Sequence, residues 1–130
     1  MSQTIFTRER FADQLTPPGH PERVERFDVM LAVADEFRQN GGEVLAPRAA
    51  TEVELARVHD RNYVALVRET AGRAVALDPD TYTSPDSYDV ACLAAGAAVS
   101  AVEHIRFRPA TTNGVPVDAR VTLTIVFRLT

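Results

Sequence analysis

The sequence predicts an α/β domain, and three observations carry that prediction. Short apolar segments of strand length alternate with longer segments of helical spacing, which is the pattern of α/β folds. The length of 130 residues suits one domain with a single packed core. Hydrophobic residues make up 45% and charged residues 25% of the chain, as in an ordinary globular domain.

The first strand and the first long helix are predicted near the N-terminus. Residues 4–6 are expected to form a short strand, and a polar loop follows it as far as Gly19. Pro21 suits the first position of a helix, with His20 beside it as a cap. Apolar residues then recur at helical spacing and predict one buried stripe, at Val24, Phe27, Met30, Leu31, Ala34 and Phe37. The stretch Asn40–Gly42 supplies the left-handed geometry that ends a helix.

Two short helices are predicted in the middle of the chain, after a second short strand in EVLAP that Pro47 closes. Thr51 is expected to cap the first of them, and Glu54 three residues later completes a capping box. Asp60 is expected to cap the second helix. The apolar side of that second helix is expected to contain Tyr63, Val64 and Val67.

The last part of the chain is predicted to hold a loop, a long helix and a terminal strand. LDPDTYTSPDS is dense in Asp, Pro, Ser and Thr, which predicts a loop. Ser84 and Pro85 are expected to start the long helix, whose Ala and Gly residues suit close packing against other elements. RPATTNGVPVDA is turn-rich, and residues 119–129 alternate as an amphipathic strand that is prone to pairing if its edge is left free.

Composition and charge exclude several classes of function. The net charge of −4 argues against nucleic-acid binding, which needs a clustered basic face. No apolar run approaches the roughly 20 residues that span a bilayer, and the N-terminus lacks a signal-peptide pattern, so we expect no membrane association. The lone Cys92 can form neither an internal disulfide nor a zinc pair with a second cysteine. The default expectation is a cytoplasmic protein.

Three segments, in this order, resemble the N-terminal part of histone-deacetylase-like proteins, the zinc-dependent amidohydrolases that include acetylpolyamine amidohydrolases and acetoin-utilisation proteins. These segments read GHPERVER, ELARVHDRNYV and LDPDTYTSPDSYDVACLAAGAAVSAV. The resemblance covers roughly Thr4 to Val102. Each motif alone is weak, and the ordered set is more specific. One departure is Val24, which stands where bacterial relatives usually have a second proline.

The resemblance implies a fold and a set of site residues. The fold is the arginase/deacetylase type, a three-layer α/β arrangement around a parallel sheet. This chain would supply only its N-terminal part in residues 1–105, followed by a divergent tail in residues 106–130 with a terminal β-strand. Arg26 would lie beneath the substrate pocket and line an internal channel. The substrate-binding rim of that pocket would comprise His20, Pro21, Asp80, Thr81 and Tyr82.

The catalytic part of the family pattern has no counterpart in this sequence. Complete members hold zinc with two Asp and one His, use an adjacent His pair as acid and base, and polarise the carbonyl with a Tyr. This chain contains neither His-His nor Asp-x-His, and its three histidines stand on different predicted elements. We therefore expect no catalytic residue, no metal ligand and no cofactor in this chain, zinc belonging to full-length members. The predicted function is the N-terminal portion of a deacetylase of acetyl-lysine or acetylpolyamine amides, inactive alone.

Simpler interpretations stand beside each of these roles. His20 is as well explained as a helix cap or loop residue, Arg26 as an exposed partner of Glu22, and Asp80 as ordinary turn chemistry. Cys92 is expected to be an inert core residue. The alternative function is a non-enzymatic binding domain that pairs with a partner, or with a second copy, through the strand at residues 119–129. A third interpretation is a truncated product that exposes apolar helix faces.

Overall fold

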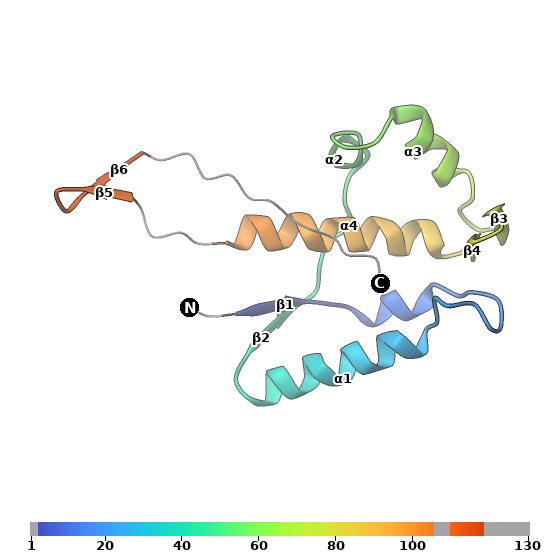
Figure 1. The fold of residues 1–130 in the computed structure, drawn as a ribbon, viewed down its shortest axis with the longest axis horizontal. Coiled ribbons are helices and arrows are strands. Elements are labelled where there is room, and N and C mark those ends of the chain that lie inside the picture. Colours follow the sequence, from blue (N-terminus) through green and yellow to red (C-terminus); the bar gives the residue numbers. More distant parts are fainter. Residues whose placement is uncertain (1–2, 106–109, 119–130) are drawn as a thin grey trace.

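The computed structural model describes residues 3–105 and 110–118, and it contains the predicted alternation of short strands and helices (Figure 1). In chain order the elements are β1 (Thr4–Phe6), the 3-10 helix η1 (Glu9–Asp13), α1 (Glu25–Gln39), β2 (Glu43–Leu45), α2 (Glu52–Leu55), α3 (Arg61–Arg68), β3 (Val75–Asp78), β4 (Thr81–Thr83), α4 (Ser87–His104), β5 (Ala110–Thr112) and β6 (Val115–Val117).

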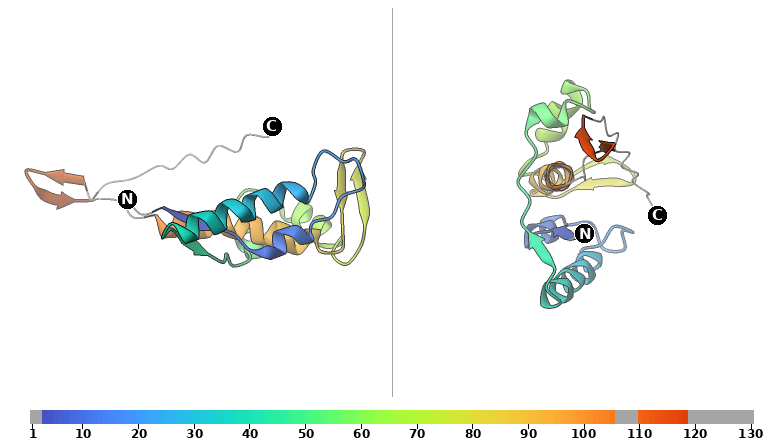
Figure 2. Two further views of the ribbon diagram at one scale, coloured as in Figure 1. Left: turned by 90° about the horizontal axis from the view of Figure 1, so that it is seen from below. Right: turned by 90° about the vertical axis from the view of Figure 1, so that its left-hand side faces the viewer.

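The parallel strands β1 and β2 form the centre of the fold, with Ile5 opposite Val44. Parallel strands cannot be joined by a tight turn, and α1 supplies the crossover between them. Helix α1 contacts β2, while α4 contacts β1, so the strand pair lies between two helices (Figure 2). This layering confirms the predicted α/β class and both strands predicted in the N-terminal third.

Helix α1 begins at Glu25 and not at Pro21, so the prediction of His20 as its cap is wrong. The residues before it form a separate turn, which the Thr16 hydroxyl closes by donating a hydrogen bond to the Glu22 carbonyl. The ring of His20 accepts a hydrogen bond within that turn and is not available to the helix end. The stop signal is confirmed, because the helix gives way to a glycine at position 41 with φ +83°.

The predicted apolar stripe on α1 is buried only in part. Ala34 is buried, and most of the other stripe residues are half-buried where η1 and β2 cover the helix. Met30 is 59% exposed, so its predicted burial is wrong. Val29 and Val33 lie on the uncovered side and are 63% and 47% exposed. One face of α1 therefore presents apolar side chains to solvent.

The two short helices start where their caps were predicted. Thr51 caps α2 and forms the complete capping box with Glu54. The Asp60 carboxylate caps α3 by accepting a hydrogen bond from the Asn62 N–H at 2.8 Å. Within α3, Val64 is buried as predicted, but Tyr63 is 53% exposed, so the prediction that it packs inward is wrong.

The segment predicted as a loop after α3 is a small antiparallel hairpin, β3–β4. Its strands are too short for an alternating pattern to be recognised. Val75 pairs with Thr83, and a bulge lies between Ala76 and Asp78. Pro79 and Asp80 form the turn. This hairpin lies at the same end of the molecule as the loop between η1 and α1 (Figures 1 and 2).

Helix α4 confirms the predicted close packing of small residues. A Cβ atom added to Gly96 would lie 1.8 Å from the Arg48 carbonyl oxygen, so the backbones meet where no side chain fits. Cys92 is buried in this helix, as predicted for a core residue. The predicted start at Ser84 is wrong, because the helix begins at Ser87. Among the described residues, no helix is both long and apolar enough to cross a membrane.

The turn-rich segment after α4 contains a second antiparallel hairpin, β5–β6, which the sequence did not predict. Its turn places Asn113 at φ 52° and Gly114 at φ +79°, the left-handed pair that a two-residue hairpin turn favours. The hairpin projects away from the helices (Figure 1). The strand predicted at residues 119–129 lies outside the described residues, and so does any pairing through it.

Candidate functional site

The ring of His20 joins the first loop to the β3–β4 turn. Its Nδ1 accepts a hydrogen bond from the Glu22 N–H at 3.1 Å, and its Nε2 lies 3.2 Å from the carbonyl oxygen of Asp80. Because Nδ1 faces a donor, it must be the unprotonated nitrogen, and Nε2 then carries the proton that it donates to Asp80. Two residues that the sequence singled out separately, sixty positions apart, are therefore in direct contact.

The β3–β4 turn is ordered by its own carboxylate. The Asp80 N–H donates a hydrogen bond to Asp78 Oδ1 at 2.8 Å. This bond, with further hydrogen bonds from Thr81, holds the pKa of Asp78 below its ordinary value. Thr81 is exposed, while Tyr82 is half-buried in β4. Asp80 and Thr81 therefore lie at the surface of the turn, and the half-buried Tyr82 packs beneath them in β4.

A buried serine attaches the base of the hairpin to the first loop. Ser84 Oγ accepts a hydrogen bond from the Leu15 N–H at 3.1 Å and lies 3.3 Å from the Asp13 carbonyl oxygen. Ser84 is 5% exposed. Close by, Arg10 pairs with Asp86 at 3.3 Å. These contacts, together with the His20–Asp80 hydrogen bond, hold the loop between η1 and α1 against the β3–β4 hairpin at more than one point.

The remaining two predicted site residues are Pro21 and Arg26. Pro21 is exposed and follows His20 in the first loop. Arg26 is exposed on the first turn of α1 and lines a surface hollow of about 410 Å³. The aromatic rings of Phe11 and Phe27, 5.8 Å apart, belong to the same hollow. Neither the channel role of Arg26 nor the rim role of Pro21 is tested by this placement, and both stay predictions.

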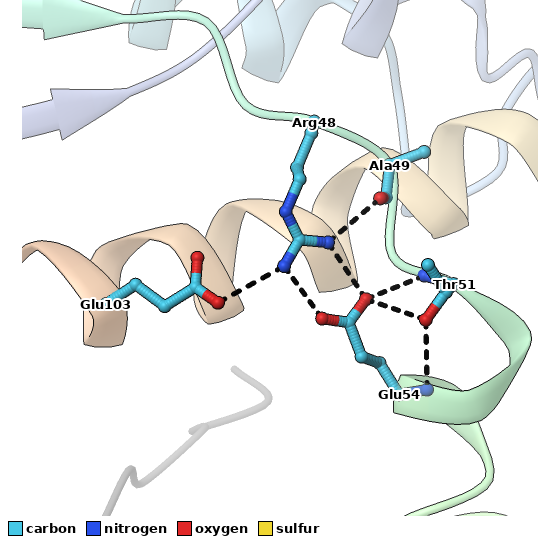
Figure 3. Close-up of polar contacts among 5 residues, drawn as sticks. All are labelled: Arg48, Ala49, Thr51, Glu54 and Glu103. Carbon is cyan, nitrogen blue, oxygen red and sulfur yellow. Dashed lines mark hydrogen bonds and ion pairs between the residues drawn. The ribbon is translucent and has the colours of Figure 1, made fainter.

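A polar cluster that the sequence did not predict joins the loop before α2 to α4 (Figure 3). Arg48 binds both carboxylate oxygens of Glu54, at 2.9 and 2.7 Å, and reaches Glu103 of α4 at 3.3 Å. The hydrogen bond from Arg48, followed by the bond from the Thr51 N–H, lowers the pKa of Glu54 well below its usual range. The bond to Glu54 likewise raises the pKa of Arg48. The capping box could be predicted from the sequence. The contact of Arg48 with Glu103, which joins the box to α4, could not, because it depends on the fold.

The described residues do not offer a set of ligands that fits zinc. Among residues 3–105 and 110–118, no three His, Cys, Asp or Glu side chains gather where they could hold a metal ion. Burial raises the pKa of the Cys92 thiol, which disfavours the thiolate that a metal would need. What the two loops offer instead is a surface of hydrogen-bonding groups.

The order of these elements matches a known family. A family model of the histone deacetylase domain matches residues 20–116. The chain belongs to the histone deacetylase family. The human protein "Polyamine deacetylase HDAC10" is 35% identical to this deacetylase-family chain over 97 residues, which cover 63% of this chain and 14% of that protein.

The solved structures give the same answer for the fold. The crystal structure of the HDA15 HD domain is similar with a TM-score of 0.64 and 27% identity, over 76% of this chain and 30% of that one. The predicted resemblance and the arginase/deacetylase-type α/β fold are thereby confirmed. The chain represents a partial, N-terminal region of a deacetylase domain, and it spans much less than two thirds of either relative.

Proposed function

We propose that this chain supplies the rim of the substrate pocket of a deacetylase and does not hydrolyse acetyl-amides by itself. The observation that carries the proposal is the hydrogen bond between His20 and the Asp80 carbonyl. It joins the two loops in which the sequence predicted rim residues. The proposed substrate-binding residues are His20, Pro21, Asp80, Thr81 and Tyr82.

The exposed groups of these loops suit an amide substrate. With its carbonyl bound to His20, Asp80 still has a free carboxylate to accept hydrogen bonds from a substrate N–H. The Thr81 hydroxyl donates to Asp78, and its oxygen can still accept a second such bond. Acetylated lysine side chains and acetylpolyamines both carry such groups. A carboxylate also attracts the ammonium groups of a polyamine. We propose acetyl-lysine or acetylpolyamine amides as the substrate class.

The catalytic step is proposed to require residues that this sequence lacks. Zinc, when bound to a complete deacetylase, activates water and stabilises the oxyanion. The sequence has neither the paired histidines nor the Asp-x-His that would support these roles. We further propose that residues 1–105 form the deacetylase portion of the chain and that residues 106–130 form a divergent tail.

We also propose a cytoplasmic location, because a single cysteine, Cys92, suits a reducing compartment.

A binding measurement on the intact chain tests the rim. An acetyl-lysine peptide and acetylspermidine are titrated into the labelled chain, and the amide signals of both loops are followed by NMR. We expect shifts confined to the residues around His20 and Asp80, and smaller shifts with Asp80→Asn. Peptide carrying unmodified lysine is the ligand control, and Asp35→Asn on the exposed side of α1 is the matched protein control.

The same samples separate the two halves of the proposal. Zinc content and release of acetate are measured in parallel. Stoichiometric zinc with turnover would show that the chain is catalytic on its own. Shifts that spread elsewhere, or that Asp80→Asn leaves unchanged, would remove the rim role.

A further inference from the structure

The His20 ring occupies a position that only its neutral form can fill. Its Nδ1 accepts a hydrogen bond from the Glu22 N–H at 3.1 Å, while its Nε2 lies 3.2 Å from the Asp80 carbonyl oxygen. One ring nitrogen must therefore accept and the other must donate, and a neutral imidazole offers that combination. A protonated imidazole carries a hydrogen on both nitrogens, so its Nδ1–H would oppose the Glu22 N–H.

The protonated ring cannot relieve this conflict where it stands. A half-turn about the Cβ–Cγ bond would bring ring carbons to the two positions, and a carbon accepts no hydrogen bond. The Glu22 N–H would be left without its acceptor, which costs free energy. The charged ring is therefore expected to leave this position, and the contact with the Asp80 carbonyl is lost with it.

Charged residues flank the ring on both loops. Glu22 and Arg23 follow it in the first loop, and Asp78 and Asp80 lie in the hairpin turn. The carboxylates favour a charged imidazole and the guanidinium opposes it. Asp78 already accepts the Asp80 N–H at 2.8 Å, whereas Glu22 and Asp80 are exposed. Their carboxylates give a charged ring new partners outside its present position.

The contacts at the base of the hairpin do not respond to the same proton. The Leu15 N–H donates to Ser84 Oγ at 3.1 Å, and neither group takes up a proton in mildly acid water. Arg10 pairs with Asp86 at 3.3 Å, and guanidinium–carboxylate pairs keep their charges in mildly acid solution. Movement of the His20 ring would therefore separate the two loops at the turn and leave the base of the hairpin attached.

We propose that protonation of His20 opens the link between the first loop and the β3–β4 turn, so that these loops are joined there only while the ring is neutral. An imidazole changes charge between about pH 5 and 8, above the range near pH 4 in which carboxylates do. Substrate binding at the rim then weakens in mildly acid solution. That consequence rests on the proposed function, whereas opening of the link does not.

NMR spectroscopy of the intact chain at about pH 8 and about pH 5 tests the link. At the higher pH we expect ring nitrogen signals with the proton on Nε2, and nuclear Overhauser effects between the ring and Asp80. At the lower pH both nitrogens are protonated, and the effects to Asp80 disappear. Those between Leu15 and Ser84 persist. Unchanged effects to Asp80 beside a doubly protonated ring would overturn the proposal.

Two phenylalanine variants show whether His20 carries the pH response. His20→Phe can neither take up a proton nor make either hydrogen bond, so the turn should be separated from the first loop at both pH values. His59→Phe makes the same change at an exposed histidine and is the matched control. It should respond to pH as the parent does. A pH response that is lost in His59→Phe, or kept in His20→Phe, would contradict the role of His20.

A peptide titration follows the consequence for the rim. The ligand is a capped acetyl-lysine peptide with no other charge, so that the ring's own charge does not repel it. We expect the affinity of the parent to fall roughly fivefold at the lower pH, as loss of about one net hydrogen bond implies. His20→Phe should bind at the weaker level throughout. Constant affinity while the link opens would remove the rim function and leave the pH-sensitive link in place.

Discussion

Single residues of α4 and of the loop before α2 set how closely these two segments approach. Gly96 lets the helix backbone lie against the carbonyl of Arg48, where a Cβ atom would be 1.8 Å from the oxygen. The Arg48 side chain then reaches across to Glu103 in the same helix. Glycine is therefore required at position 96 because no Cβ atom fits there, although a helix interior favours alanine over glycine by about 1 kcal/mol.

Replacing Gly96 with alanine is expected to destabilise the chain. The helix-propensity gain is smaller than the cost of forcing the backbones apart, which is about 1–3 kcal/mol for overpacking. Urea unfolding followed by circular dichroism measures the change. Ala94→Val adds volume at an exposed position of the same helix and should have little effect. A Gly96→Ala chain as stable as the parent would show that the loop yields without cost.

The Arg48–Glu54 pair predicts how stability depends on pH. Because the folded state lowers the pKa of Glu54, the folded state binds this proton more weakly than the unfolded state. The pair thus stabilises the fold above the ordinary carboxyl value of 4.5, and the stabilisation is lost as pH falls below it. Glu54→Gln should unfold at lower urea concentration than the parent at pH 7, and the gap should close in acid.

The matched control for this pH series is Glu69→Gln, which makes the same chemical change at an exposed residue after α3. Its urea midpoint should follow the parent at every pH. A gap between the Glu54→Gln chain and the parent that stays constant down to strongly acid pH would mean that the ion pair does not carry the effect.

Elements that depend on neighbouring residues were predicted from the sequence, and elements that depend on distant ones were not. The capping box at Thr51 and the cap at Asp60 involve residues within a helical turn, so their spacing reveals them. The start of α1 was misplaced because the His20 ring hydrogen-bonds within its own loop and to Asp80. No pattern in the neighbouring sequence predicts the hydrogen bond between His20 and Asp80, because the two residues are far apart in the chain. That hydrogen bond joins the two loops of the predicted rim.

Short hairpins were missed for a different reason. Strands of three or four residues are too brief for alternation to stand out. The Asn113–Gly114 turn closes the β5–β6 hairpin, and among the described residues its two strands pair only with each other. Isolated two-stranded hairpins are marginal in water, so this element is expected to unfold separately from the others.

Gly114→Ala should melt the β5–β6 hairpin and leave the remaining structure unchanged. The glycine has φ +79°, which an alanine adopts only with strain. NMR detects loss of the cross-strand nuclear Overhauser effect between Thr111 and Pro116. The thermal unfolding midpoint of the helices is measured in parallel by circular dichroism. Thr111→Ser, within β5, is the control. A fall in the helix midpoint would show that the hairpin contributes to the core.

At the scale of the whole molecule, much apolar surface is left uncovered. Among the described residues, no large side chain is below 2% exposure. Exposed apolar residues occur on several elements, among them Val29, Met30, Val33, Val58 and Leu66. Solvent-exposed apolar patches mark surfaces that normally meet a partner. This agrees with a chain that corresponds to part of a larger deacetylase domain.

The uncovered face of α1 is expected to bind an apolar dye such as ANS in the folded state. The double variant Val29→Lys, Val33→Lys should reduce dye fluorescence without loss of helix content, because both side chains are already exposed. Glu36→Lys, on the same helix, is the control for added positive charge. Dye fluorescence that is unchanged by the double variant would place the binding surface elsewhere.

The bridge made by His20 also determines which substitutions this position tolerates. An asparagine carries an acceptor near the place of Nδ1, within reach of the Glu22 N–H, and a glutamine carries a donor near the place of Nε2, toward Asp80. Neither amide serves both partners at once. A lineage that drifts away from histidine here must therefore give up one of the two contacts, or compensate for it in the opposite loop.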